Sequence, residues 1–174
     1  METWKTEIPE SFSFGSAVEV KSTQKIWLIG AGGEKDGVGP GGGDRILVFD
    51  IKTHIFEELE SNLKVLRVQH KCIVTNLNGN EVILVTGGIF SGKLVEMINT
   101  QNGSVTMLKS EMVFARFGHG IGILRIKNED KIVVFGGCYA DDNVEIFDNE
   151  TKRWKLAPDI KMSQDRYFFS FPNF

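Results

Sequence analysis

VEMIN, at residues 95–99, returns 49 residues later as VEIFD, at residues 144–148. A double glycine precedes each copy at the same distance, Gly87-Gly88 in the first and Gly136-Gly137 in the second. Each glycine pair ends an apolar run of four residues. A fixed period of this size indicates one supersecondary unit stacked on its own copies, so we predict a repeat array.

A third, looser copy lies nearer the start of the chain. Its apolar run covers residues 26–29, its double glycine is Gly32-Gly33, and its last element covers residues 47–50. Bulky side chains also recur seven residues apart in every copy: Phe49 and Phe56, Ile98 and Val105, and Phe147 and Trp154. We expect each pair to place one side chain on a third strand and one on a fourth, both packed against the adjacent repeat.

The copy with the clearest pattern, from Arg116 to about Pro158, indicates four antiparallel strands. They are predicted at residues 119–124, 131–135, 144–147 and 153–156. The second is apolar at four consecutive positions, which is typical of a strand buried on both faces. Residues 148–151 favour a turn, because Asp and Asn side chains accept hydrogen bonds from nearby backbone amides. Four strands at a period of about 50 residues match one blade of a β-propeller.

We therefore predict an all-β fold, a partial β-propeller of about three four-stranded antiparallel blades. The blades are expected at approximately residues 12–60, 67–109 and 116–158, with orphan strands at 3–8 and 166–172. Propellers close with about four to eight blades, so three blades leave two apolar faces uncovered. Three explanations stay open: a fragment of a longer protein, two copies completing one ring, or an open stack. One local conflict accompanies the prediction, since residues 56–64 have helix-forming composition where the repeat requires a strand.

Composition and charge narrow the classes of function. The 174 residues are 41% hydrophobic and 25% charged, as in ordinary soluble domains. A net charge of -3 offers no basic face for nucleic acid. Cys72 and Cys138 show neither a disulfide framework nor metal-ligand spacing, which favours a reducing compartment. With no signal-peptide core and no apolar run of membrane-spanning length, we expect a cytoplasmic protein without membrane contact.

Taken together, these elements resemble kelch repeats, and most of all those of the BTB-kelch subgroup. The resemblance rests on the double glycine, the VE-x-F-D stretch, the Trp seven residues after an aromatic, and Met-x3-Arg at residues 112–116 and 162–166. It covers nearly the whole chain and is strongest in the third copy and loosest in the first. Val105 and Phe56 replace the usual Trp, and residues 30–33 alter the glycine signature.

The resemblance implies a non-catalytic protein–protein interaction module. In the BTB-kelch subgroup, the propeller recognises client proteins and the BTB region presents them to a cullin ubiquitin ligase. These residues include no BTB region, so such bridging would need a part that this chain lacks. The alternative is a cytoskeletal protein that binds actin, as several kelch proteins do. A second copy of the chain is a further expected partner, because it would complete the ring.

Three arginines recur where the chain enters each first strand: Arg67, Arg116 and Arg166. His70 and His119 follow the first two at one repeat position, which marks them as scaffold residues. In kelch proteins that bind acidic peptides, arginines at this position surround the mouth of the pocket, and guanidinium groups suit carboxylate recognition. Alternatively, each arginine fixes its own connection by donating to backbone carbonyls. With Tyr139, the three arginines form the predicted partner-binding set.

Enzymatic interpretations fail on the context of their motifs. Residues 87–93 fit GxxxxGK, but Leu94 replaces the Ser or Thr that binds magnesium, and a strand pattern follows instead of a helix. Residues 30–44 hold eight glycines, yet Lys35 interrupts GxGxxG, so an enlarged loop is the better interpretation. Some propellers similar to kelch arrays are copper oxidases, which need a Tyr, His and Cys cluster that the sequence does not show. We expect no enzyme, no cofactor and no metal.

Overall fold

The computed structural model describes residues 15–31 and 43–163, and this part of the chain contains strands, turns and no helix. Its strands form three four-stranded antiparallel sheets. Blade 1 consists of β1 (Ser16–Val20), β2 (Lys25–Ala31), β3 (Arg45–Asp50) and β4 (Ile55–Glu58). Blade 2 consists of β5 (Lys71–Leu77), β6 (Asn80–Thr86), β7 (Val95–Asn99) and β8 (Val105–Met107). Blade 3 consists of β9 (Gly120–Ile126), β10 (Glu129–Phe135), β11 (Asn143–Asp148) and β12 (Arg153–Lys161).

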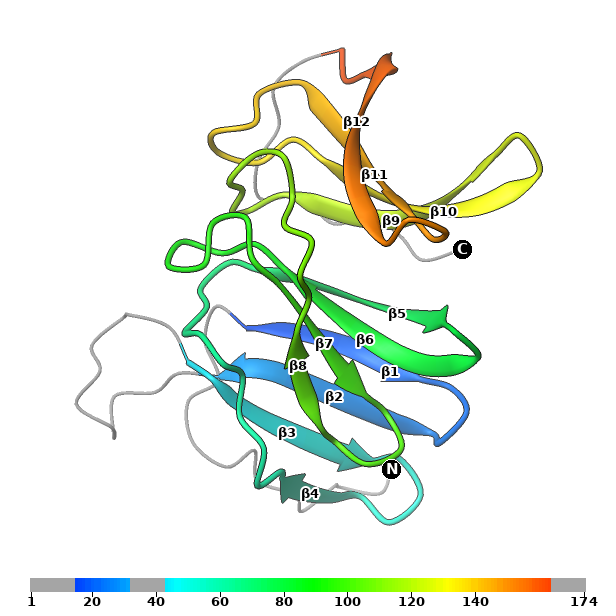
Figure 1. The fold of residues 1–174 in the computed structure, drawn as a ribbon. Helices are drawn as coiled ribbons and strands as arrows, with labels where there is room; N and C mark the ends of the chain where they lie inside the picture. The colour runs from blue at the N-terminus through cyan, green and yellow to red at the C-terminus, as the bar shows by residue number, and fades with distance from the viewer. Residues whose placement is uncertain (1–14, 32–42, 164–174) are drawn as a thin grey trace, which may run out of the picture.

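Within each blade the strands pair in chain order, as in a meander. The blades also follow one another in chain order, with β1 in contact with β5 and β5 in contact with β9 (Figure 1). First strands of neighbouring blades therefore meet, as they do around the centre of a propeller. The predicted all-β, partial-propeller fold is confirmed. The predicted orphan strands at 3–8 and 166–172 lie outside the described residues.

The sequence repeat is also a repeat of strand register. In the three blades, the residue directly before the glycine signature is Ile29, Thr86 and Phe135. Each pairs with one equivalent position of the third strand, namely Ile46, Val95 and Val144. This register corrects the alignment of the first copy, because Gly30 and Ala31, and not Gly32-Gly33, follow Ile29 at the glycine positions.

Hydrophobic clusters between the sheets hold the blades together. Successive side chains of a strand point to opposite faces, so a second strand can pack against both neighbours. In β6, Ile83 and Val85 belong to the cluster shared with blade 1, whereas Val82 and Leu84 belong to the cluster shared with blade 3. The run predicted to be buried on both faces lies in β10, where Ile132 and Val134 join the cluster between blades 2 and 3 while Val133 and Phe135 join a separate cluster. That prediction is confirmed.

The bulky pairs seven residues apart pack as predicted in two of the blades. Ile98 and Val105 join the cluster between blades 1 and 2, and Phe147 and Trp154 join the cluster between blades 2 and 3. The Phe147 and Trp154 ring centroids lie 5.1 Å apart. The corresponding rings of blade 1, Phe49 and Phe56, also touch, but they are only half-buried and belong to neither cluster.

Because the strands of a blade alternate in direction, its loops lie at two opposite ends. One end holds the short turns between first and second strands and between third and fourth strands. We name it the turn rim, defined as residues 21–24, 51–54, 78–79, 100–103, 127–128 and 149–152. The other end holds the loops between second and third strands and the connections between blades. We name it the loop rim, defined as residues 64–70, 87–94, 113–119 and 136–142.

Local hydrogen bonds build the turn rim. Asp50, Asn99 and Asp148 occupy one repeat position, and each side chain accepts hydrogen bonds from the backbone amides two and three residues later. Bonds from the Thr53 and Lys52 amides lower the pKa of Asp50. The predicted turn at residues 148–151 is confirmed.

Candidate functional site

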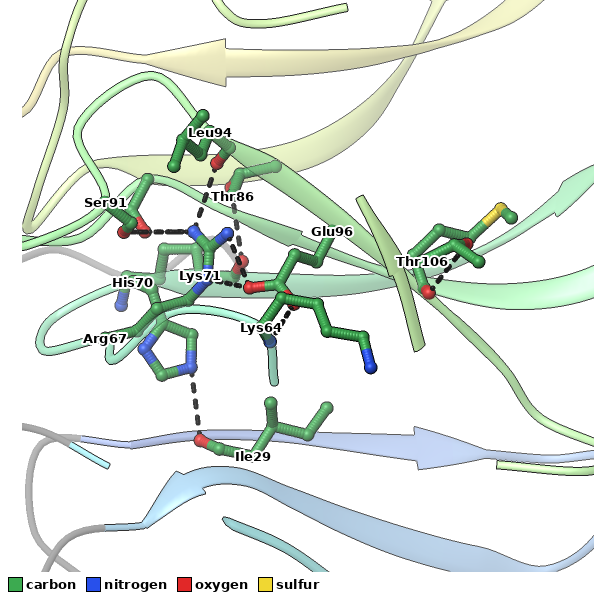
Figure 2. A network of polar contacts seen from close by, with 12 residues as sticks. Ile29, Lys64, Arg67, His70, Lys71, Thr86, Ser91, Leu94, Glu96 and Thr106 are labelled. Atoms are coloured by element: carbon green, nitrogen blue, oxygen red, sulfur yellow. Dashed lines mark hydrogen bonds and ion pairs between the residues drawn. The ribbon is translucent and has the colours of Figure 1, made fainter. Parts of the chain in front are cut away.

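Arg67, one of the predicted partner-binding residues, lies in the interior of blade 2 with 0% of its surface exposed. Its Nη2 lies 2.9 Å from Oε1 of Glu96, and its Nε donates to the same oxygen at 3.0 Å. Its Nη1 donates to the carbonyl oxygen of Gly87 at 2.5 Å and to that of Leu94 at 3.1 Å. Figure 2 shows Arg67 between Glu96 and Leu94. The backbone amide of Lys64 donates to the second oxygen of Glu96 at 2.6 Å. Arg67 and Glu96 therefore connect the incoming chain to both ends of the loop 87–94.

Arg116 repeats this arrangement in blade 3 and is equally buried. Its Nη2 donates to Oε1 of Glu145 at 2.9 Å, and the amide of Val113 donates to Oε2 of the same carboxylate at 2.6 Å. Its Nη1 donates to the carbonyl oxygens of Gly136 at 2.6 Å and Asn143 at 3.0 Å. Burial lowers the pKa of both arginines, while the adjacent glutamates act in the opposite direction. Each buried guanidinium is thus matched by one carboxylate and holds one loop closed at its base.

The structure corrects the placement of Arg67 and Arg116 at the mouth of a pocket. A guanidinium with no exposed surface cannot bind a partner's carboxylate unless it first leaves its own buried ion pair. Breaking that pair is strongly unfavourable. The alternative interpretation, that each arginine fixes its connection through backbone carbonyls, agrees with the contacts. Arg166 lies outside the described residues. In blade 1, Leu47 takes the third-strand position that Glu96 holds in blade 2.

The two repeat histidines join neighbouring blades. His70 Nε2 lies 3.1 Å from the carbonyl oxygen of Ile29 in blade 1, and His119 Nε2 lies 2.9 Å from Oγ1 of Thr86 in blade 2. Burial lowers the pKa of His70 to about 3, and it also lowers the pKa of His119. Both rings are therefore neutral in the folded chain at physiological pH. They serve as scaffold residues, as the repeat predicts.

In blades 1 and 2, the first glycine after the second strand is required by the histidine of the next blade. Gly30 and Gly87 occupy one repeat position, with φ of +73° and +61°. A Cβ added at Gly30 would lie 2.4 Å from Cε1 of His70, and one added at Gly87 would lie 2.8 Å from Cε1 of His119. The glycine that defines the repeat therefore provides both a left-handed backbone and room for a side chain of the neighbouring blade.

Tyr139, the fourth predicted partner-binding residue, is 75% exposed in the loop 136–142. Its ring meets the half-buried Phe117 ring edge to face, with centroids 5.6 Å apart. The equivalent position of blade 2 holds Phe90, which is 60% exposed. Sequence reasoning missed Phe90, although 49 residues separate it from Tyr139 and the repeat had already aligned the two loops.

The segments of the loop rim are joined into one surface by backbone hydrogen bonds. The amide of Ile89 donates to Val68 in the preceding connection at 3.0 Å, and the amide of Arg116 donates to Gly92 at 3.2 Å. The amide of Cys138 then donates to the carbonyl oxygen of Phe117 at 3.1 Å. The loops that carry Phe90 and Tyr139 are therefore linked through the connection between their blades.

Exposed side chains differ between the two rims. The described loop rim exposes seven: Lys64, Leu66, Ile89, Phe90, Lys93, Tyr139 and Asp141. Four of these seven are large and apolar, and Leu66 and Ile89 are 41% and 46% exposed. Across the described turns of the turn rim, the only exposed large hydrophobic residue is Ile51. A concentration of exposed apolar side chains at one end of a molecule is typical of an interaction surface.

The GxxxxGK segment has no geometry for phosphate binding. Its amides already donate to carbonyl oxygens within the fold, Gly88 to Arg116 at 2.8 Å and Gly92 to Gly88 at 2.8 Å. A phosphate loop instead directs such amides at the ligand and continues into a helix. Here the loop continues into β7. The glycines serve the blade junction, as the repeat indicates.

Comparisons with known proteins give the chain no relative: no protein-family model matches it, and no curated protein matches it. Among the described residues, no group of three or more His, Cys, Asp or Glu side chains is placed to hold a metal ion. Cys72 and Cys138 are free thiols, and burial raises the pKa of Cys72 to about 12. No helix that could cross a bilayer occurs in residues 15–31 or 43–163.

Proposed function

We propose that this chain is a non-catalytic module of a kelch-type propeller and binds a protein partner through the loop rim. The exposure of Phe90 and Tyr139 at one repeat position is the observation that carries the proposal. Packing inside the blades does not account for these rings, because their side chains point into solvent while the aromatic pair Phe147 and Trp154 is buried. Aromatic side chains on well-anchored loops are frequent anchors of protein interfaces.

Within this proposal, the chain supplies client recognition for a ubiquitin-ligase substrate adaptor. Its support is the similarity of the VE-x-F-D and Met-x3-Arg elements to the BTB-kelch subgroup. Contact with a cullin ligase would require a BTB region outside these residues, so partner binding and ubiquitin transfer are separate questions. A cytoplasmic location belongs to the same proposal, and the free thiols of Cys72 and Cys138 suit a reducing compartment.

The test compares the wild-type chain with Phe90→Ala/Tyr139→Ala on the loop rim and Ile51→Ala on the turn rim. Proteins captured from cell extract by the wild type are identified, and the most enriched one is purified and titrated into all three chains. We expect the double substitution to weaken binding by about 30-fold or more, since an aromatic anchor contributes about 2 kcal/mol or more. Ile51→Ala should bind like the wild type.

Equal affinities for all three chains would contradict the proposal, provided that thermal melting shows each variant to be folded. Co-sedimentation with actin filaments separates the cytoskeletal alternative from the adaptor. Filament binding that survives Phe90→Ala/Tyr139→Ala would favour actin as the partner through another surface.

A further inference from the structure

We infer that the loop rim selects an apolar, weakly charged segment of its partner and not an acidic one. This inference rests on the proposed function of the rim, and it concerns the chemistry that the rim recognises. It follows from where the cationic groups lie, from which side chains reach solvent, and from how firmly the loops hold them.

The strongest cations of this region are not available to a ligand. Arg67 and Arg116 are fully buried, and each is neutralised by one carboxylate, Glu96 or Glu145. Nη1 of each arginine donates to the carbonyl oxygens that end its loop, and Nη1 of Arg67 also donates to the Ser91 hydroxyl. The arginines therefore act as positioning residues beneath the rim. Within the described loop rim, no guanidinium group is exposed to donate to the carboxylates of an acidic peptide.

The exposed charges of the rim are few and of both signs. Lys64 and Lys93 are cationic, and Asp141 is anionic. They cannot supply the concentrated positive potential that attracts an acidic segment. They are outnumbered by the exposed apolar side chains of the rim, which are Leu66, Ile89, Phe90 and Tyr139. Removing these apolar surfaces from water is the largest favourable contribution that the rim can make to binding.

The loops present their aromatic side chains in a fixed arrangement. Tyr139 has φ of +69°, a left-handed conformation that is unfavourable for a tyrosine by about 1–2 kcal/mol. The loop keeps it there through internal bonds, in which the amide of Asn143 donates to Ala140 at 2.9 Å and that of Ala140 donates to Gly137 at 3.3 Å. A strained residue that is retained while its ring stays exposed indicates a functional role for the ring. A rigid aromatic side chain also loses little entropy on binding.

The experiment selects ligands from a random peptide display library on the full chain, with counter-selection on Phe90→Ala/Tyr139→Ala. We expect the retained peptides to carry at least two large apolar residues and little net charge. Affinities of synthesised peptides, measured by titration, should fall by about 30-fold or more in the double variant. They should change little between low and high salt, because charge contributes little to them. Lys64→Glu/Lys93→Glu serves as the matched charge variant and should bind these peptides nearly as the wild type does.

Three outcomes would overturn the inference in distinguishable ways. Peptides rich in Asp and Glu that depend on the rim, but weaken at high salt and in Lys64→Glu/Lys93→Glu, would leave the proposed function standing and refute the apolar specificity. Failure to retain any peptide better on the wild type than on Phe90→Ala/Tyr139→Ala would refute the proposed function itself. Light scattering on the unliganded chain measures whether a second copy of the chain occupies the loop rim. Self-association that Phe90→Ala/Tyr139→Ala abolishes would also overturn the inference.

Discussion

The turn rim and the loop rim are made by the same twelve strands, yet they differ in how they are held. At the turn rim, each turn between a third and a fourth strand is closed by its own Asp or Asn, which accepts hydrogen bonds from the amides two and three residues later. A loop at the loop rim is closed by an arginine 20 and 27 residues distant, paired with a glutamate on the third strand. These turns are closed by local side-chain bonds, whereas the loops of the loop rim have buried long-range bonds in addition to their local ones.

This difference explains why the apolar side chains gather on the loop rim. A loop whose two ends are held by a buried arginine needs few of its own side chains to close it; in the loop 87–94, Ser91 donates to the Gly87 carbonyl oxygen. Its outward positions are therefore free to carry residues such as Phe90 and Tyr139. In the short turns, by contrast, side chains such as Asn99 and Asp148 are occupied with the turn itself.

The largest effect should come from breaking a buried ion pair under the loop rim. Glu145→Ala leaves the Arg116 guanidinium buried without its counter-charge, so we expect the free energy of unfolding to fall by about 3–5 kcal/mol. Urea denaturation measures this change in the free energy of unfolding. Asp130→Ala removes an exposed ion pair with Arg125 beside the turn rim and should leave stability nearly unchanged. Similar losses in both variants would contradict the distinction between the rims.

Acid should destabilise the chain through the loop rim, because His70 and His119 lie there. Burial lowers the pKa of both imidazoles. As the pH falls below about 6.5, these two histidines therefore stay neutral in the folded chain but gain protons in the unfolded chain. Stability should therefore be full above about pH 6.5 and decrease by about 1.4 kcal/mol per pH unit for each histidine below it. Between pH 7.5 and 5.5 the two together lower it by about 3 kcal/mol.

Urea midpoints measured across this range check the acid effect. His70→Gln removes one of the two titrating groups, so its pH slope should be about half that of the wild type. An unchanged slope in this variant would show that other groups cause the acid sensitivity.

Two glycines with positive φ offer a matched pair across the rims. A Cβ at Gly87 would lie 2.4 Å from the carbonyl oxygen of Arg116, whereas a Cβ at Gly79 on the turn rim would meet no atom within 4 Å. Each substitution to Ala places a side chain in the left-handed conformation, which should lower the free energy of unfolding by about 1 kcal/mol. Gly87→Ala adds backbone overlap, so we expect it to be more destabilising by about 2 kcal/mol. Equal decreases in the unfolding temperature of the two variants would show that the backbone at the blade junction moves to make room for the added Cβ.

The smallest effect is expected within the turn rim. Asn99→Ala removes the side-chain acceptor of the Gln101 and Asn102 amides and should lower the free energy of unfolding by about 1 kcal/mol. Asn99→Asp keeps an acceptor at the same place and should restore most of that loss. Denaturant unfolding of the two variants compares them. A loss in Asn99→Asp as large as in Asn99→Ala would argue against the side-chain bond.

Most of the fold was predictable because the sequence contains three copies of one strand pattern. It correctly overrode local propensity at residues 56–64, where helix-forming composition gives β4 (Ile55–Glu58) and then a connection. The first glycine signature was misaligned by two residues, because an adjacent glycine run offers several matches to a doublet. Only the strand register, which pairs Ile29 with Ile46, decides among them.

The site was less predictable, because an arginine looks the same in sequence whether it faces solvent or a buried carboxylate. A signal was nevertheless present. Arg67 precedes Glu96, and Arg116 precedes Glu145, by the same 29 residues. A conserved separation between opposite charges in two copies indicates an ion pair within the blade. The exposure of Phe90 and Tyr139, however, depends on how the connections between blades cover the loops, which pattern alone does not specify.

The contact between a glycine of one blade and a histidine of the next has a consequence for how such a chain can grow. Blade 2 contributes His70 to the junction before it and Gly87 to the junction after it. A duplicate of this unit, inserted behind the original by gene rearrangement, would meet compatible halves on both sides. Lengthening or shortening the array by whole units therefore requires no new complementary surface, and every added unit would bring one more loop with an outward position available for ligand contact.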